Sequence, residues 1–469
     1  MELQQVAGSY RDPSGYVFER DGEIFRAIAN VGAPHFEASR DILSELAAEG
    51  RVVSFSEIDP TSIGLAREQW PFVLECSRLP FVSMPYEWSF SLLRDAALFH
   101  LDLHLDLLAR GFTLSDASAY NVQFVGPNPI FIDHLSVRPY QDGEFWTGHR
   151  QFCEQFLNPL LLRAYLDIAP NSWYRGSLEG ISILDLARLL PLRRKLSWKA
   201  LSHIVLPSKF QSGSTSDKDA NFSVQGRRFP LAGFVGMLRQ LRRWISHLTP
   251  ANVSKTTWAN YAKTTTYSDD ETSLKKNVVS KLVISSGAKS VIDLGCNSGD
   301  YSQVSLGGGA TQVIGFDFDQ QALDQAHQRA KADDLNFLPL YLDAKNPSPD
   351  QGWMQRERGG LAGRAKADLV LALAFEHHLA IAHNIPLDQV VNWIASIAPA
   401  GIIEFVPKTD PTVRKMLALR EDIFPNYTEE NFQAILSSHR KISGREQISS
   451  SGRTLYTFET PESSFKGTA

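Results

Sequence analysis

The chain has 469 residues, more than one ordinary hydrophobic core accommodates, which predicts about two or three domains. Its composition, 43% hydrophobic and 21% charged, is that of a soluble globular protein, and a net charge of -5 excludes a general attraction to nucleic acid. The sequence lacks an apolar run of about eighteen residues and a basic, apolar N-terminus, so we expect a cytoplasmic protein without a transmembrane segment. Its three cysteines lie far apart, so neither a disulfide framework nor a zinc knuckle is predicted, and no metal is expected.

Alternating apolar residues predict a β-hairpin over residues 15–28, with its turn at Asp21-Gly22. We expect a helix over residues 36–49 and a long helix over residues 88–110, each followed by a glycine. Short strands are predicted at residues 122–125 and 129–132.

The segment Asp116-Ala-Ser-Ala-Tyr-Asn121 lies between the long helix and these strands, and Asp133 follows them. This order resembles the end of a protein-kinase-like domain of the aminoglycoside-phosphotransferase kind. There, an Asp-x-x-x-x-Asn catalytic loop precedes a metal-binding Asp. The resemblance implies an α+β kinase-like fold with a nucleotide site at Asp116, Asn121 and Asp133, which would take ATP and magnesium.

Several departures from the kinase pattern indicate a degenerate site. Leu114 stands where a histidine is usual, and no glycine-rich phosphate loop is visible near Gly15. The sequence has no lysine before Lys195, so Arg26 is the candidate to replace the ammonium that grips the phosphates. Three interpretations remain open: active phosphotransfer, a retained pocket without catalysis, and turn residues that cap short strands.

Residues 193–255 carry twelve Lys and Arg against two Asp, a local net charge of +10. Residues 211–220 predict a mobile loop, and residues 234–248 predict a basic amphipathic helix. This helix could contact a membrane surface or nucleic acid, or its cationic face could pack on the acidic remainder of the chain. We therefore divide the chain into a kinase-like domain (1–192), a basic helical segment and linker (193–255) and a C-terminal domain (256–469). The alternative for residues 193–255 is that they form the end of the N-terminal domain.

The C-terminal domain opens with an expected helix over residues 270–285 and an apolar strand over residues 290–294. The glycine turn Gly295-Cys-Asn-Ser-Gly299 follows, and a second strand, 312–316, ends at Asp317. An NAD site would require Gly-x-Gly-x-x-Gly, which this turn lacks. The segment resembles motif I of class I S-adenosylmethionine-dependent methyltransferases, and the resemblance continues in the family's order through Leu342-Asp-Ala344 and residues 367–374.

The resemblance implies a Rossmann-like seven-stranded α/β sheet with S-adenosylmethionine as cofactor. It places Asp293, Gly295 and Gly299 at the methionine and ribose side, Asp317 at the ribose hydroxyls, and Asp343 at the adenine amine. The alternative for Asp293 and Asp343 is a polar cap at the sheet edge, and a cap is favoured for Asp319. The candidate cofactor-binding residues are Asp293, Gly295, Asn297, Gly299, Asp317, Phe318, Asp343, Ala344 and Ala374.

Aromatic residues precede the first helix of this domain at Trp258, Tyr261 and Tyr267. In methyltransferases, similar leaders fold over cofactor and substrate, which makes these residues lid candidates. Packing on the sheet is the alternative.

The fourth strand is followed by Phe375-Glu-His-His378, where the methyl acceptor is expected because ligands gather at the carboxyl edge of such sheets. His378 or His377 could accept a proton from a hydroxyl or an acidic carbon, with Glu376 orienting the ring. The alternative is that one histidine caps a helix and the other packs under the cofactor. A metal site with His383 is disfavoured, because the spacing lacks the i, i+4 pairing of a zincin.

The tail completes the predicted sheet with strands at residues 402–406, 441–448 and 454–459 and a helix over residues 411–420. Glu404 interrupts an apolar strand and could face the acceptor pocket. An unpaired buried carboxylate would cost several kcal/mol, so Glu404 is expected to have a partner.

These observations predict a two-domain S-adenosylmethionine-dependent methyltransferase with an N-terminal module that binds a substrate or partner. The sequence lacks the Asn/Asp-Pro-Pro-Tyr motif that grips planar amines, so a hydroxyl, carboxyl or carbon acceptor is favoured, preferably on a small molecule. The alternatives are an ATP-dependent phosphotransferase using Asp116 and Asp133, and a non-catalytic cofactor-binding scaffold.

Overall fold

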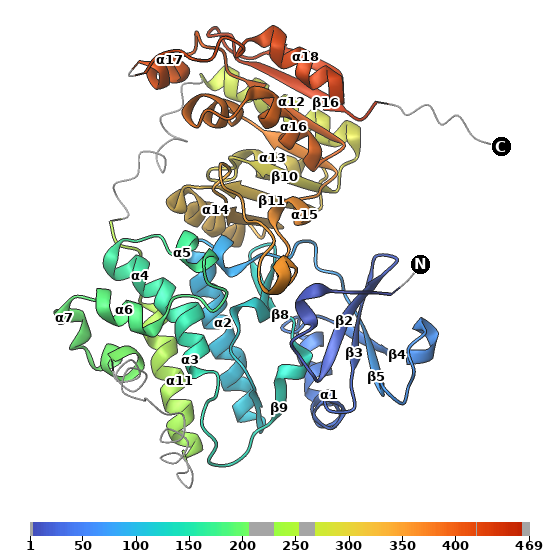
Figure 1. Cartoon of the computed structure of the whole chain (residues 1–469), viewed down its shortest axis with the longest axis vertical. Coiled ribbons are helices and arrows are strands. Elements are labelled where there is room, and N and C mark those ends of the chain that lie inside the picture. Colours follow the sequence, from blue (N-terminus) through green and yellow to red (C-terminus); the bar gives the residue numbers. More distant parts are fainter. Residues whose placement is uncertain (1–2, 206–228, 253–267, 419, 462–469) are drawn as a thin grey trace. The chain divides into compact units, whose positions relative to one another are not determined.

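The computed structural model describes residues 3–205, 229–252, 268–418 and 420–461. The chain forms two compact units, drawn mainly blue to green and yellow to red in Figure 1. Unit 1 comprises residues 1–254 together with 350–358, and unit 2 comprises residues 255–349 and 359–469. Within the described residues, no helix has both the length and the apolar composition needed to cross a membrane.

Unit 1 contains a five-stranded antiparallel sheet in the order β1-β2-β3-β5-β4. The predicted hairpin is formed by β2 (Gly15–Arg20) and β3 (Glu23–Ile28), and Asp21 and Gly22 take positive φ in the turn. The other strands of this sheet are β1 (Gln4–Gln5), β4 (Phe55–Ile58) and β5 (Phe72–Cys76). Two small antiparallel sheets pair β6 (Phe112–Leu114) with β9 (Val137–Pro139) and β7 (Val122–Val125) with β8 (Asn128–Phe131).

The long predicted helix is α2 (Phe90–Ala109), which Ser89 caps by accepting the N–H of Leu92. The remaining helices of unit 1 are α1 (Ala33–Ala48), α3 (His149–Phe152), α4 (Asn158–Leu166), α5 (Asn171–Arg175), α6 (Ile183–Leu189), α7 (Leu192–Lys195), α8 (Trp198–Ala200) and α11 (Leu231–Ser246). Two π-helical turns, Cys153–Leu157 and Leu201–Val205, continue α3 and α8.

The basic helix α11 packs against α2, and Arg242 forms an ion pair with Asp102. The Trp244 ring is buried and donates its N–H to the hydroxyl of Tyr165. The apolar face of α11 and the Arg242 cation therefore both contact other parts of unit 1. The predicted mobile loop at 211–220 lies outside the described residues.

Segment Asp350–Arg358 follows the third strand of unit 2 in the sequence, yet its contacts assign it to unit 1. Glu357 forms an ion pair with Arg11, and the Arg358 guanidinium lies 4.2 Å from the centre of the Tyr120 ring. No residue pattern predicted that this segment would separate from the C-terminal domain.

Unit 2 is an α/β structure built on a seven-stranded sheet in the order β12-β11-β10-β13-β14-β16-β15. The first five strands are parallel, and β16 is antiparallel to both of its neighbours. The strands are β10 (Ser290–Leu294), β11 (Gln312–Asp317), β12 (Phe337–Tyr341), β13 (Leu369–Ala372), β14 (Ala400–Phe405), β15 (Lys441–Gln447) and β16 (Thr454–Glu459).

Helices alternate with these strands, as parallel connections require. They are α12 (Asp269–Ser286), α13 (Asp300–Gly307), α14 (Gln320–Ala332), α15 (Leu361–Arg364), α16 (Leu387–Ile397), α17 (Pro411–Leu417) and α18 (Glu429–His439). A π-helical turn, His378–Ala382, follows β13. The predicted strands of this unit agree with the structure to within two residues, whereas the helix expected over 411–420 ends at Leu417.

Candidate functional site

The glycine turn after β10 takes the conformation that its sequence indicates. Gly295, Asn297 and Gly299 have φ values of 75°, 49° and 87°. At Gly299 a Cβ atom would lie 2.4 Å from the Phe337 ring, so this position excludes any side chain as well as requiring positive φ. Gly299 is also the N-cap of α13, which directs the first N–H groups of that helix to the carboxyl edge of the sheet.

Asp317 ends β11 beside this turn. Its two carboxylate oxygens accept the backbone N–H groups of Asn297 and Asp319, both at 2.9 Å. Burial raises the pKa of Asp317 to about 6, against the effect of these hydrogen bonds. The residue remains partly exposed, and the two hydrogen bonds fix the orientation of its carboxylate.

Asp293 lies beneath the turn rather than on its surface. Its side chain is 1% exposed and accepts a hydrogen bond from the Ser302 hydroxyl at 2.7 Å. Burial raises the pKa of Asp293 to about 6. Asp319 accepts the N–H groups of Gln321 and Ala322 and caps α14, as the favoured alternative expected.

Asp343 and Ala344 follow β12 on the same edge and are partly buried. Phe318 is 57% exposed and stands directly after Asp317, the residue expected to bind the ribose. The lid candidates Trp258, Tyr261 and Tyr267 lie outside the described residues.

Ala374 stands two residues after β13 with φ of 51°, a conformation that costs an L-residue about 1–2 kcal/mol. Its N–H donates to the Glu404 carboxylate at 2.9 Å. Unfavourable backbone of this kind persists where its surroundings hold it, commonly at functional sites.

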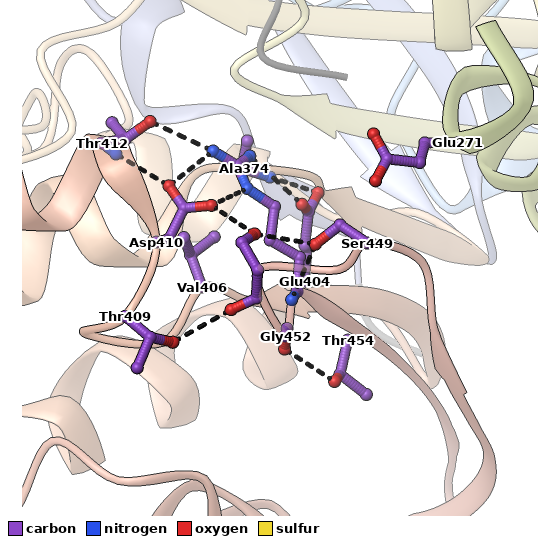
Figure 2. Close-up of polar contacts among 12 residues, drawn as sticks. Glu271, Ala374, Glu404, Val406, Thr409, Asp410, Thr412, Ser449, Gly452 and Thr454 are labelled. Atoms are coloured by element: carbon purple, nitrogen blue, oxygen red, sulfur yellow. Dashed lines mark hydrogen bonds and ion pairs between the residues drawn. The ribbon is translucent and has the colours of Figure 1, made fainter. Parts of the chain in front are cut away.

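Glu404 belongs to a buried ionic network, part of which is drawn in Figure 2. The Lys275 ammonium lies 2.6 Å from one Glu404 oxygen and the Arg453 guanidinium 3.5 Å from the other. Arg453 also donates to Asp410 at 2.7 and 3.0 Å. These four side chains are at most 2% exposed. The expectation that Glu404 has a partner is therefore confirmed.

The two ends of this network differ in their proton affinity. Burial lowers the pKa of Lys275 and outweighs the opposing effect of Glu404. At Asp410 burial acts to raise the pKa, but hydrogen bonds from Arg453 and Ser451 prevail and lower it to about 2. Asp410 therefore stays ionised and stabilises the Arg453 cation beneath Glu404.

Glu376 and the histidines occupy different surroundings. The buried Glu376 carboxylate accepts hydrogen bonds from the Tyr427 hydroxyl at 2.8 Å and from the Val406 N–H at 3.0 Å. Burial raises its pKa to about 8. The expectation that Glu376 orients a histidine is wrong, because its hydrogen bonds go to Tyr427 and Val406.

His378 begins the π-helical turn and is partly buried, and burial lowers its pKa to about 4. His377 is buried with its pKa well below the usual value, and its Nδ1 has no hydrogen-bond partner within the described residues. Both imidazoles are therefore neutral at pH 7. His383 is exposed.

In unit 1 the structure brings Asp116, Asn121 and Asp133 together. The Asn121 amide donates to Asp116 at 3.1 Å and to Asp133 at 3.4 Å. Arg26 on β3 donates to Asp133 at 2.9 Å. Burial and the neighbouring Asp133 charge raise the pKa of Asp116 to about 6. The guanidinium therefore already neutralises the carboxylate that would bind a metal ion.

Comparison with known proteins assigns the chain to a family. It is 51% identical over 459 residues to the nodulation protein NoeA of Rhizobium meliloti (strain 1021), covering 98% of this chain and 96% of that protein. The chain belongs to the NoeA family. No family model matches it.

Two further similarities concern methyltransferases. The NoeA-family chain is 40% identical over 60 residues to the ribosomal protein L11 methyltransferase of Aeromonas salmonicida (strain A449), covering 13% of this chain and 20% of that one. The N-methyltransferase NodS of Bradyrhizobium japonicum WM9 is 15% identical, with 41% of this chain and 98% of NodS covered and a TM-score of 0.31.

Sequence reasoning missed Lys275, Arg453 and Tyr427. Lys275 lies on α12 among other charged residues. Arg453 follows the serine- and glycine-rich segment 449–452 and directly precedes β16, so neither residue belongs to a motif. The one available signal was the apolar run around Glu404, which required a partner without identifying it.

Proposed function

We propose that this chain is an S-adenosylmethionine-dependent methyltransferase whose active site is the carboxyl edge of β10, β11 and β13. One observation carries the proposal: the backbone N–H groups of Asn297, in the glycine turn, and of Asp319 hold the Asp317 carboxylate, and the residue stays partly exposed. A carboxylate at the end of the second strand is suited to accept both hydroxyl groups of a ribose.

The residues present fit this cofactor. Asp317 would hold the ribose, Asp343 and Ala344 the adenine, and the turn Gly295–Gly299, with positive φ at three of its residues, the methionine portion. When bound, S-adenosylmethionine supplies a methyl group already activated by the sulfonium charge. The protein then has to align the acceptor, exclude water and manage the acceptor's proton.

His378 is the proposed proton acceptor. It follows β13 on the edge that carries Asp317 and is only partly buried; burial lowers its pKa to about 4, which keeps the ring neutral at pH 7 and also weakens it as a base. A neutral imidazole can take a proton from a hydroxyl or an acidic carbon. Glu376, whose pKa is raised to about 8, instead stabilises the loop through Tyr427 and Val406.

Glu404 has a positioning role in this proposal. Its carboxylate holds the N–H of Ala374, which fixes the backbone from which Phe375 and the histidines follow. We place the acceptor beside this segment and favour a hydroxyl, carboxyl or carbon acceptor on a small molecule.

The kinase-like unit is proposed to bind a substrate or partner. A phosphotransferase is the weaker candidate, because Arg26 occupies the Asp133 carboxylate that would coordinate magnesium. Magnesium-dependent ATP turnover that is lost in Asp116→Ala would reverse this ranking.

The proposed function is tested by S-adenosylhomocysteine formation in the presence of hydroxyl, carboxyl, carbon and amine acceptors. We expect turnover with one of the first three classes, a strong loss in His378→Gln and little change in the exposed control His383→Gln. Cofactor binding without turnover in every class would instead favour the non-catalytic scaffold.

A further inference from the structure

Unit 1 contains a cluster of two histidines and a cysteine that is separate from both sites described above. His149 Nε2 and His203 Nδ1 are 2.9 Å apart, and Cys153 Sγ lies 3.7 Å from the same His149 nitrogen. One ligand atom from each residue lies within 4.8 Å of the other two. Cys153 and His203 are at most 3% exposed, and His149 is partly exposed.

The local backbone around the cluster is unusual. Cys153 begins one π-helical turn, and His203 lies in the other, Leu201–Val205. π-Helical turns are rare in proteins, and those that do occur are often found at functional sites. Here they bring His203 against His149 and Cys153, which are one helical turn apart.

The hydrogen bonds within the cluster do not satisfy its polar atoms. His149 and His203 bond to each other, and His203 Nε2 is buried without a hydrogen-bond partner within the described residues. The rings of Trp146 and Trp244 flank the two imidazoles, so this is an apolar region of the unit. In the geometry given by the 2.9 Å contact, His203 Nδ1 faces His149 and Cys153, and Nε2 is the ring nitrogen that points away from them.

The donor set and its spacing suit zinc. Two imidazoles and a thiolate are favoured zinc ligands, with Zn–N of about 2.0–2.1 Å and Zn–S of about 2.3 Å in tetrahedral geometry. Those bond lengths place nitrogen ligands about 3.3 Å apart and a nitrogen and a sulfur about 3.6 Å apart. The observed 2.9 and 3.7 Å differ from these values by a few tenths of an ångström, and the third pair, between Cys153 and His203, lies within 4.8 Å.

We propose that His149, Cys153 and His203 bind one zinc ion, which fastens the end of the α8 segment to the helix that begins with α3. Binding releases the Cys153 thiol proton to solvent, and the proton shared by the two imidazoles moves to a ring nitrogen that does not face the metal. A water molecule would complete the tetrahedron from the partly exposed His149 side. The role is structural, because no residue of the proposed methyl-transfer site takes part.

The proposal is tested on the full chain purified without a polyhistidine tag or chelator. We expect about one zinc per chain by elemental analysis and, after exchange, a cobalt spectrum with the near-ultraviolet band of a thiolate ligand. Cys153→Ser should lose that band, and His203→Gln should lose most of the metal. Cys76→Ser is the matched control, since Cys76 is another buried free thiol of unit 1, and it should keep both.

A second measurement keeps the test decisive if the ligand variants fold poorly. A chelator should lower the melting temperature of the wild-type chain, and added zinc should restore it. Wild-type protein that holds no zinc, takes up no cobalt and melts identically with chelator would overturn the proposal and leave a buried polar cluster. Retention of the thiolate band in Cys153→Ser would overturn it as well.

Discussion

Breaking the buried pair of Lys275 and Glu404 should cost far more stability than breaking an exposed pair of similar geometry in the same unit. Lys275 and Glu404 are 2.6 Å apart, with side chains 2% and 0% exposed. Lys441 and Glu459 are 2.7 Å apart, with side chains 57% and 47% exposed. The nearly equal distances isolate the effect of burial.

Lys275→Met removes one partner and leaves Glu404 with the Ala374 N–H and the more distant Arg453. Breaking a buried pair costs about 3–5 kcal/mol, and we expect about 3 because these contacts remain. Lys441→Met should cost about 0–1 kcal/mol, because water solvates both of those charges.

The assay is urea unfolding of the full chain at pH 7, read at the transition of unit 2. With a slope of about 2 kcal/mol per molar urea, the midpoint should fall by about 1.5 M in Lys275→Met and by less than about 0.5 M in Lys441→Met. The double variant Lys275→Met/Glu404→Gln should lose less stability than the two single changes combined. A Lys275→Met midpoint equal to that of Lys441→Met would refute the reasoning.

Two further predictions concern the glycine turn and the acid beneath it. Burial raises the pKa of Asp293 from 3.8 to about 6, so the native protein binds a proton that the unfolded chain has released, and stability falls as pH rises from about 4 to 6. Asp293→Asn should therefore gain about 3 kcal/mol relative to wild type between pH 4 and 7 in urea unfolding, and a pH-independent difference would contradict this cause. Gly299→Ala should weaken S-adenosylhomocysteine binding. In urea unfolding, it should also lower the free energy of unfolding by about 1–3 kcal/mol more than Gly309→Ala does. Both glycines have positive φ, but no described atom lies within 4 Å of a Cβ at Gly309, so equal costs would exclude the Phe337 clash.

The sequence was sufficient for features that short segments determine. Apolar runs locate β10 and β11, and the glycine positions locate the turn, because strand length and positive φ depend on nearby residues. The spacing of Asp116 and Asn121 also predicted two residues that meet in the structure.

The sequence was not sufficient for contacts that the fold makes between distant segments. No residue close to Glu376 in the sequence indicates that the Tyr427 hydroxyl would donate a hydrogen bond to its carboxylate. The two adjacent histidines therefore suggested the wrong partner. Likewise, Lys275 and Arg453 both contact Glu404, although they lie near opposite ends of the sequence of unit 2. Such partners follow from strand order and helix packing, which residue patterns leave open.

The most direct test of the proposed function is calorimetric titration of the full chain with S-adenosylhomocysteine. We expect micromolar binding in wild type and in Asp333→Ala, a change of an exposed carboxylate in the same unit. Binding should disappear in Asp317→Ala, with folding checked by circular dichroism. Undiminished binding in Asp317→Ala, or no binding in the wild-type chain, would contradict a methyltransferase site at this edge of the sheet.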